Sequence, residues 1–540
     1  MKILIRHTVA TVSKNIHHYL SLCLCTRCVQ LFLLKIALLC CFVVYNEFDF
    51  RIFRYLLFEI ILFEYIFLYQ SMVIQGIFGI FLFVHVFQLI NIFSTGQYIE
   101  TETLLNLNTY ASLSRDELIK NGVLFCVLVI LWLPSVFRKG IIKGTKPVVA
   151  LIVIFCISCV FLPRLPFRNF ADKAIQAYTI YTFKTSPTLK KIFINNSVAV
   201  GPSILDCNGY NIIVIFAEGT SQCVISEQFT PFLHSLAQKS LLFKNYFGHT
   251  APTFRGIRGQ LMSGYQFKGG YYSDGTGLGQ ISSDRIKNTI SNNINLNSIL
   301  KRYGYATAFV SPHAAQDPFT HFLKYIGFDK IFLYGNSSIS DKELYKHLGD
   351  EIIDLHKSGE KFFVSTYVLG THHGQDSPDL KYGDGKNPYL NKFYNQDHWF
   401  GKFFSRLYAA GVFKNTILVF TADHATYPSN EFRKTFQSNV PYFIDRIPLY
   451  FYTENITTQI VDAHNRNSLC MAPTLLNIVG IKDEPNYFLG ESLFSDKDNV
   501  YSHISNIGYE YFDISSGVVR PFEPPREIKK NIDTFMKIFG

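Results

Sequence analysis

The sequence predicts two parts: a helical membrane domain, and an α/β domain with a mainly parallel sheet covered by helices on both faces. Long apolar runs fill the first third of the 540 residues, whereas ordinary mixed sequence fills the rest. In the rest, short apolar runs rich in β-branched residues alternate with helical stretches, as in parallel strands joined by crossover helices. We expect a membrane domain over 1–163, a connector at the membrane surface over 164–208, and the α/β domain over 209–540.

Five stretches of the first third are long and apolar enough for membrane helices, since about twenty apolar residues span a bilayer. They are 29–45, 52–69, 72–93, 121–137 and 147–163. The second contains Glu59 and Glu64, and acids within a membrane helix usually face a bundle interior or a cavity. A helix lying flat at the interface is the alternative for that stretch.

Basic residues predict the orientation of these helices. Lys and Arg gather in the N-terminal segment and in the 138–146 loop, whereas acids outnumber them between the third and fourth stretches. Cytoplasmic loops carry the excess of Lys and Arg, so the α/β domain is expected outside the membrane. We attribute the net charge of +10 to topology and lipid contact; no basic patch interleaved with aromatic residues suggests nucleic-acid binding.

The α/β pattern predicts strands and helices in alternation. The expected strands are Asn211–Ala217, Ala306–Val310, Phe362–Leu369, Thr416–Thr421 and Ile447–Tyr452. The expected helices are Thr230–Lys239, Leu296–Tyr303, Lys342–Ser358, Asn395–Ala410 and Ala472–Val479. Ligands of parallel sheets gather at the carboxyl ends of the strands, so polar clusters that directly follow strands are candidates for one site.

Two such clusters have the chemistry of a metal site. Glu218 follows the first strand, and Asp423 and His424 follow the fourth. A set of oxygen and nitrogen ligands suits Zn or Mn. Glu218 alone could equally be a loop acid or a helix cap, and an Asp-His pair alone is a weak signal. Their shared position at strand ends favours one metal site.

A third cluster contains Thr253, Arg255 and Gly256. It predicts a hydroxyl nucleophile at an anion-binding helix N-terminus, with Arg255 available to pair a phosphate. Threonine is a poor nucleophile at neutral pH, and metal coordination would activate it. The alternative is a surface helix capped by Thr250 or Thr253, and the motif alone does not decide between the two.

A fourth cluster, His372 and His373 between Thr371 and Gly374, follows the third strand. Either histidine could bind a phosphoryl oxygen or protonate a leaving alkoxide. A structural hydrogen bond is the alternative for each of them.

In this order, and behind five membrane stretches, the four clusters resemble the sulfatase-like lipid head-group transferases, namely the lipoteichoic-acid synthase and phosphoethanolamine transferase families. The resemblance covers most of 211–500. It implies a fold of the alkaline-phosphatase/sulfatase type and a divalent metal, Zn or Mn. It also implies roles for individual residues: metal ligands Glu218, Thr253, Asp423 and His424, nucleophile Thr253, and substrate-binding Arg255, His372 and His373.

Two departures bear on this resemblance. Ala425 stands where many relatives have Gly, and His373-Gly374 replaces the familiar x-Pro after the substrate histidine. The second departure leaves open which histidine meets the phosphate.

The resemblance implies an enzyme that transfers phosphoethanolamine from a membrane phospholipid to an envelope glycan such as lipopolysaccharide, through a phospho-threonine. The three cysteines of the α/β domain suit an oxidising periplasm, which favours this acceptor and a multi-pass inner-membrane protein with a periplasmic catalytic domain. The alternatives are a glycerol-phosphate transferase, a metal-dependent phosphodiesterase or sulfatase-like hydrolase, and a non-enzymatic envelope protein.

Overall fold

The structure is a computed structural model that describes most of the chain. The described residues are 26–46, 50–67, 72–95, 97–105, 115–136, 146–162, 165–182, 193–266, 294–315, 317–497 and 499–539. The chain divides into two units, one made of residues 1–100 and 115–174 and the other of residues 101–114 and 175–540.

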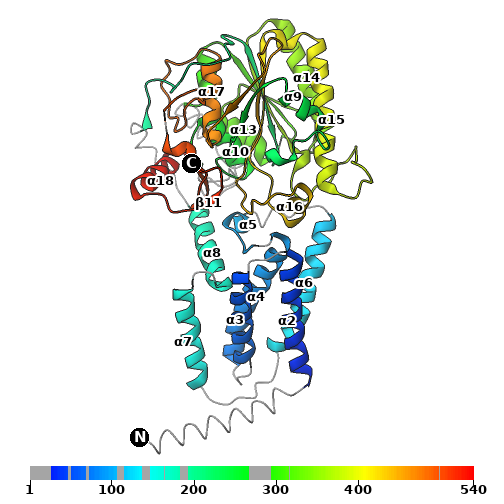
Figure 1. Cartoon of the computed structure of the whole chain (residues 1–540), viewed down its shortest axis with the longest axis vertical. Coiled ribbons are helices and arrows are strands. Elements are labelled where there is room, and N and C mark those ends of the chain that lie inside the picture. The colour runs from blue at the N-terminus through cyan, green and yellow to red at the C-terminus, as the bar shows by residue number, and fades with distance from the viewer. Residues whose placement is uncertain are drawn as a thin grey trace, which may run out of the picture. The chain divides into compact units, whose positions relative to one another are not determined.

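The first unit is helical, and a helix lies at each of the five apolar stretches (Figure 1). These helices are α2 (Thr26–Asn46), α3 (Phe50–Ile66), α4 (Met72–Thr95), α6 (Arg115–Val136) and α7 (Lys146–Phe161). Among the described residues, Gly76–Thr95 is apolar and long enough to cross a membrane. The helices Ile152–Phe161 and Pro166–Thr179 are bent relative to each other, and they add a second span if the two together count as one. The number of five membrane spans therefore stays a prediction.

The two acids of α3 are paired inside this unit. Glu59 is fully buried and lies 2.9 Å from Nδ1 of His85, and Glu64 forms an ion pair with the buried Lys35. Buried charges inside apolar helices require such partners. The pairing favours packing of α3 within the helix bundle over a helix lying flat at an interface.

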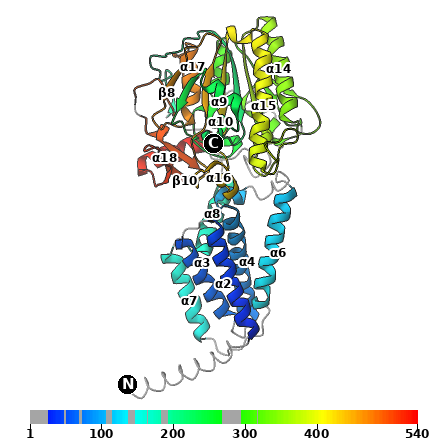
Figure 2. The ribbon, with the colours of Figure 1, turned by 45° about the vertical axis from the view of Figure 1, so that its right-hand side comes forward.

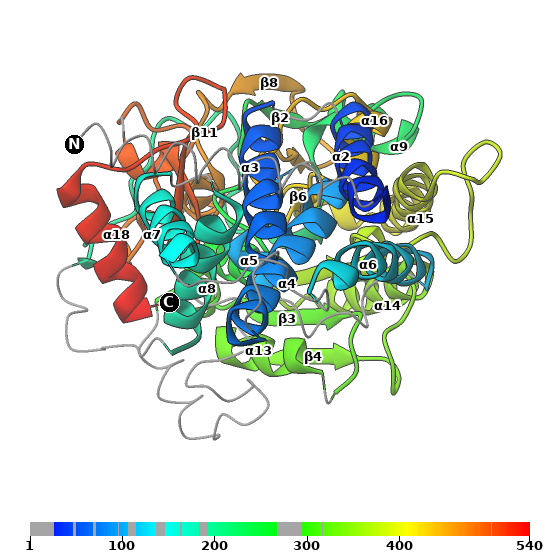
Figure 3. The same cartoon turned by 90° about the horizontal axis from the view of Figure 1, so that it is seen from below.

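The second unit is built on an eight-stranded sheet in the order β4-β3-β5-β1-β6-β7-β2-β8. Seen from below, β4 and β8 lie at opposite edges (Figure 3). The strands are β1 (Asn211–Ala217), β2 (Leu241–Lys244), β3 (Ala306–Ser311), β4 (Lys330–Leu333), β5 (Phe362–Val368), β6 (Thr416–Ala422), β7 (Leu449–Tyr452) and β8 (Gln459–Asp462). All neighbours pair in parallel except β7, which is antiparallel to both β6 and β2.

Helices cover both faces of this sheet, because successive side chains of β1 point alternately to two apolar cores. Ile212, Val214 and Phe216 belong to one apolar core, whereas Ile213 and Ile215 belong to the other. The first core includes residues of α10 (Thr253–Met262), α12 (Leu296–Arg302), α13 (Pro318–Ile326) and α17 (Met471–Ile478). The second includes residues of α9 (Pro231–Ala237), α14 (Asp341–Ser358) and α15 (Pro388–Ala409), of which α14 and α15 lie side by side (Figure 2). A strand buried on both faces reads as a continuous apolar run.

The remaining elements lie outside the eight-stranded sheet. Helix α5 (Thr101–Leu105) is short, α8 (Pro166–Thr182) is amphipathic, and α16 (Asn430–Phe436) follows β6. A three-stranded sheet of β9 (Ile504–Ile507), β10 (Glu510–Asp513) and β11 (Arg520–Pro521) precedes α18 (Arg526–Phe539). Ile532, Phe535 and Met536 of α18 form a core with Met262, the last residue of α10, and with Tyr265. This core supports α10 from outside the main sheet.

Candidate active site

Three neighbouring strands bring the predicted clusters together at one edge of the sheet. Strand β1 lies between β5 and β6, and Ala217 at its end is in register with Val368 and Ala422 at theirs. The pairing continues past the strands, since the amide of Glu218 donates to Val368 and the amide of Asp423 donates to Ala217. Glu218 and Asp423 must therefore leave the sheet side by side.

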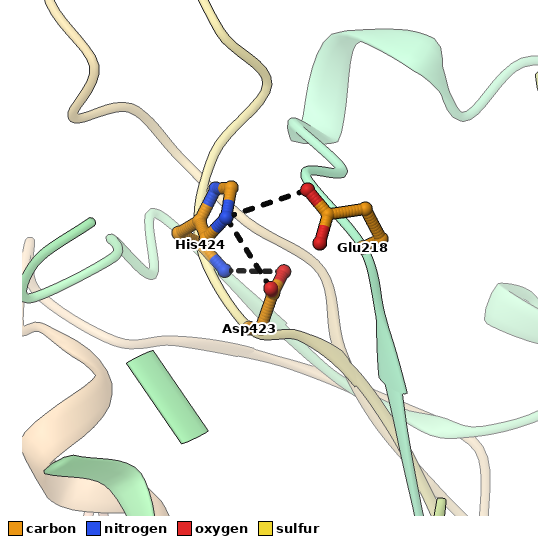
Figure 4. A group of neighbouring side chains, drawn as sticks. All are labelled: Glu218, Asp423 and His424. Atoms are coloured by element: carbon orange, nitrogen blue, oxygen red, sulfur yellow. Dashed lines mark hydrogen bonds and ion pairs between the residues drawn. The ribbon is translucent and has the colours of Figure 1, made fainter. Parts of the chain in front are cut away.

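Glu218, Asp423 and His424 form a buried group whose ligand atoms lie within 4.8 Å of one another (Figure 4). Nε2 of His424 lies 3.5 Å from Oε1 of Glu218 and 3.3 Å from Oδ2 of Asp423. Among the described residues this is the one group of acids, histidines or cysteines with the spacing of a metal site.

The hydrogen bonds around this group leave Oδ2 of Asp423 and Nε2 of His424 available to bind an ion. Oδ1 of Asp423 accepts the amides of Gly219 and His424, both at 2.8 Å, whereas its buried Oδ2 has no hydrogen-bond partner among the described residues. Nδ1 of His424 lies 2.7 Å from the carbonyl of Ala425, which fixes this nitrogen as the donor and leaves Nε2 with its lone pair. Two carboxylate oxygens and an imidazole nitrogen fit Zn or Mn.

The two carboxyl groups have opposed pKa shifts. Burial, followed by the negative charge of Glu218, raises the pKa of Asp423 well above its usual value. Burial also opposes ionisation of Glu218, but four neighbours outweigh this effect and hold the pKa of Glu218 below its usual value. They are the charges of His424 and His372 and the hydroxyls of Tyr367 and Thr253. Two buried like charges this close cannot both ionise readily without a cation between them.

Thr253 is the first residue of α10, and its side chain reaches this group. Its hydroxyl donates to Oε2 of Glu218 at 2.9 Å and lies 3.3 Å from Nε2 of His424, while the residue is 9% exposed. The first amides of a helix lack intrahelical partners and favour negative charge. The position therefore suits a hydroxyl that attacks an anionic phosphorus centre.

Two residues of α10 hold the helix against the end of β6. Nε2 of Gln260 donates to the carbonyls of Ala422 and Asp423 at 2.9 and 3.2 Å. Gly256 packs so closely that a Cβ there would lie 2.1 Å from the carbonyl oxygen of Asp423. Close backbone approach is a common reason for glycine at a fixed position. The Thr-x-x-Gly spacing thus sets the distance between Thr253 and the ligands.

The structure separates the two histidines that the sequence left as alternatives. Nδ1 of His372 lies 2.8 Å from the carbonyl of His373, and the His372 ring is close enough to affect the pKa of both Glu218 and His424. His373 lies 2.9 Å from the hydroxyl of Tyr389, and its ring packs on Tyr427. Burial holds the pKa of His373 well below its usual value. The charge of His372 thus acts on the metal-binding group, whereas His373 contacts Tyr389 and Tyr427; the substrate-binding role of each histidine stays a prediction.

Arg255 departs from its predicted position. It is fully buried, and Nη1 donates to the carbonyl of Ala251 at 2.8 Å. Two residues along a helix are about 200° apart around its axis, so Arg255 cannot share the face of Thr253. The hydrogen bond to Ala251 fixes the turn before α10, and the phosphate-binding role of Arg255 stays a prediction. The hydroxyl of Thr250, the alternative helix cap, donates to the carbonyl of Asn506 at 2.6 Å.

Sequence reasoning missed three residues around this site. The hydroxyl of Tyr367 contacts Oε2 of Glu218. The carboxylate of Asp341 accepts the amide of Gly370 at 2.9 Å, and the ammonium of Lys392 donates to the carbonyl of His372 at 3.1 Å. Tyr367 carried a readable signal, since it lies near the end of a predicted strand. Asp341 and Lys392 lie on helices, where nothing local distinguishes them.

Comparisons with known proteins agree with this fold. The sulfatase family model matches residues 210–481, half of the chain. A crystal structure of an alkaline phosphatase superfamily protein from Vibrio parahaemolyticus is similar, with 19% identity, a TM-score of 0.50, and coverage of 68% of this chain and 92% of that one. At this identity the likeness concerns the fold alone.

Two further solved structures are similar at lower scores. The lipoteichoic acid synthase LtaP from Listeria monocytogenes has 18% identity, a TM-score of 0.48, and coverage of 67% of this chain and 95% of that one. The C-terminal periplasmic domain of EcEptC from Escherichia coli has 14% identity, a TM-score of 0.41, and coverage of 58% and 95%. No curated protein matches the chain.

Gly256→Ala tests the close packing of α10 on β6. The added Cβ would force the helix away from Asp423, which costs about 1–3 kcal/mol of stability and moves Thr253. We expect catalytic activity to fall about 100-fold, because small misplacements of reacting groups have effects of that size. Gly248→Ala is the control, since a Cβ there would meet its nearest atoms at 3.8 Å. Equal activity in the two variants would contradict the packing argument.

Asp341→Asn tests the buried acid beneath Gly370. Burial raises the pKa of Asp341 to about 7. The folded protein then retains a proton that the unfolded chain releases above pH about 4, so Asp341 lowers stability progressively as pH rises from about 4 to about 7. Asparagine keeps the acceptor for Gly370 without the charge. We expect Asp341→Asn to raise the thermal midpoint of the detergent-solubilised chain at pH 8, by the equivalent of at most about 4 kcal/mol, and to leave it unchanged near pH 4. Parallel pH profiles would refute this.

Proposed function

The chain belongs to the sulfatase family, and on that premise we propose that it transfers phosphoethanolamine from a membrane phospholipid to an envelope glycan such as lipopolysaccharide. One observation supports this above the others: the hydroxyl of Thr253 lies 2.9 Å from Glu218 and 3.3 Å from His424, at a helix N-terminus. The arrangement provides a nucleophile, a proton acceptor and a site for anionic oxygens. These are the requirements of a two-step transfer.

In the first step Oγ1 of Thr253 attacks the phosphorus of the phospholipid head group. Its proton passes toward Oε2 of Glu218, which already accepts the hydrogen bond. The bond from phosphorus to the glycerol oxygen breaks, and diacylglycerol leaves with a proton donated by His372. The product is a phosphodiester between Thr253 and ethanolamine.

In the second step a hydroxyl of the glycan attacks the same phosphorus. Its proton passes to His372, and the bond from phosphorus to Thr253 breaks. Glu218 returns the proton to Oγ1 of Thr253, and His372 keeps the proton of the glycan hydroxyl, so the chain returns to its starting state. The amides at the start of α10 stabilise negative charge on the phosphoryl oxygens in both steps.

Glu218, Asp423, His424 and Thr253 are the residues that would hold a divalent Zn or Mn ion. When bound, such an ion lowers the pKa of a coordinated hydroxyl and stabilises charge on phosphoryl oxygens. Oδ2 of Asp423 and the lone pair of Nε2 of His424, which lie 3.3 Å apart, are the features that fit it.

Membrane anchoring has a physical purpose in this proposal. The donor lipid is confined to the bilayer, so a tethered domain meets it at a high effective concentration. The helices of the first unit supply the anchor, with the catalytic unit on the periplasmic face of the inner membrane. The basic residues of the N-terminal segment and of the 138–146 loop support this orientation.

A second candidate, transfer of glycerol phosphate, is favoured by Lys392. This lysine is 1% exposed, and its ammonium donates to the carbonyl of His372, the histidine beside the metal-binding group. A cation there disfavours the ammonium of ethanolamine and favours a neutral head group. Sulfate-ester hydrolysis is less compatible, because formylglycine requires cysteine or serine where this chain has Thr253.

One experiment separates these activities. The full chain in detergent receives Zn²⁺ or Mn²⁺ and a phospholipid labelled in its head group, either phosphatidylethanolamine or phosphatidylglycerol, with and without lipopolysaccharide. We expect labelled phosphoethanolamine on the glycan, detected by mass spectrometry. Label transferred only from phosphatidylglycerol would select the second candidate. Water-soluble label released equally without glycan would indicate a hydrolase and overturn the transfer proposal.

Thr253→Ala tests the nucleophile. We expect at least a 1,000-fold loss of transfer and no phosphorylated peptide spanning residue 253, because the attacking oxygen is gone. Folding should change little, since only a hydroxyl and a methyl group are removed. Thr250→Ala is the matched control: it loses a buried hydroxyl that contacts Asn506 instead, so transfer should persist. Full activity of Thr253→Ala, or loss confined to Thr250→Ala, would defeat the assignment.

A further inference from the structure

The sheet register places Tyr367 next to Glu218. Tyr367 of β5 is the register partner of Phe216 in β1, and register partners project from the same face of a sheet. Glu218 follows Phe216 by two residues, so it projects from that face as well. The hydrogen bond from the amide of Glu218 to Val368 keeps the two chains aligned at this point. The backbone therefore brings the two side chains together.

The hydroxyl of Tyr367 shares one carboxylate oxygen with the proposed nucleophile. It contacts Oε2 of Glu218, the same oxygen that accepts the hydrogen bond of Thr253. The other oxygen, Oε1, is the one that faces His424 at 3.5 Å. With Oε2 committed to two hydroxyls, Glu218 presents Oε1 to the point shared by the metal-binding atoms.

Packing fixes the position of the Tyr367 hydroxyl. The residue is buried, and its ring lies 5.1 Å from the ring of Phe319 and is stacked on His313 at 6.0 Å. A side chain held in this way aims its hydroxyl in one direction and loses little freedom when it makes a hydrogen bond. Tyr367 can thus hold the rotamer of Glu218.

We propose that Tyr367 is a positioning residue that orients Glu218 for the divalent cation. This inference rests on the proposed function, because it concerns the same metal site. Residues behind a metal ligand fix its orientation, and their loss typically weakens metal binding 10–100-fold. Tyr367 acts through its contact with Oε2 of Glu218.

A purely structural role for Tyr367 predicts a different outcome. The ring would then matter and the hydroxyl would not, so phenylalanine would replace tyrosine without any effect on metal affinity. Tyr345 provides the matched comparison, because it is also a buried tyrosine of this unit and its hydroxyl has no hydrogen-bond partner among the described residues.

The test measures Zn²⁺ affinity of the full chain in detergent by competition with a chromophoric chelator, for the wild type, Tyr367→Phe and Tyr345→Phe. We expect the dissociation constant of Tyr367→Phe to rise at least 10-fold and that of Tyr345→Phe to stay within 2-fold of the wild type. Thermal unfolding of the metal-free proteins checks that all three are folded. Wild-type affinity in a folded Tyr367→Phe would overturn the inference.

Loss of affinity in both tyrosine variants would also overturn it, because the effect would then follow from any buried hydroxyl. Failure of the proposed function has a separate signature. A wild-type chain that binds neither Zn²⁺ nor Mn²⁺ would remove the metal site itself, whereas stoichiometric binding that is indifferent to Tyr367→Phe would remove only the positioning role.

Discussion

The parallel alignment of β1 with β5 and β6 is the constraint on which the site depends. Ala217 is in register with both Val368 and Ala422, so the residues that follow these strands emerge at one edge of the sheet. Glu218 and Asp423 are 205 positions apart in the chain, but the register of β1 with β6 makes them neighbours. The chemistry proposed for this unit requires that neighbourhood.

This arrangement concentrates like charge where water is excluded. Glu218 and Asp423 are both buried, and the pKa of Asp423 is raised well above its usual value while that of Glu218 is lowered. Buried charges without partners are costly, and a divalent cation would relieve this pair. The sheet and the packing of Gly256 and Gln260 hold the ligands in place, so the fold opposes their separation. Burial of the two carboxyl groups therefore costs stability in the metal-free protein and favours binding of a cation.

The sequence was informative where strands bury both faces. The continuous apolar run Asn211–Ala217 predicted β1 to the residue, and the acids and histidines after such runs predicted the metal-binding group. The sequence was less informative where function depends on the direction in which a side chain points. Arg255 lies two residues after Thr253, which suggested a shared site, yet its side chain is buried and donates to the carbonyl of Ala251. Tyr367 lies near the end of a predicted strand, but its partner Glu218 is on the neighbouring strand, and Asp341 reaches Gly370 from a helix that no local pattern marks. The reversed direction of β7 was likewise hidden, because an antiparallel core strand has the same apolar run as a parallel one.

The most direct measurement is the position of the ion in crystals of the full chain grown with Zn²⁺, located by anomalous X-ray scattering at the zinc edge. We predict one peak bounded by Glu218, Asp423, His424 and Oγ1 of Thr253, at about 2.0–2.2 Å from the ligand atoms. A zinc ion held elsewhere in the chain, with Thr253 outside its coordination sphere, would contradict the proposal that these four residues form one catalytic centre.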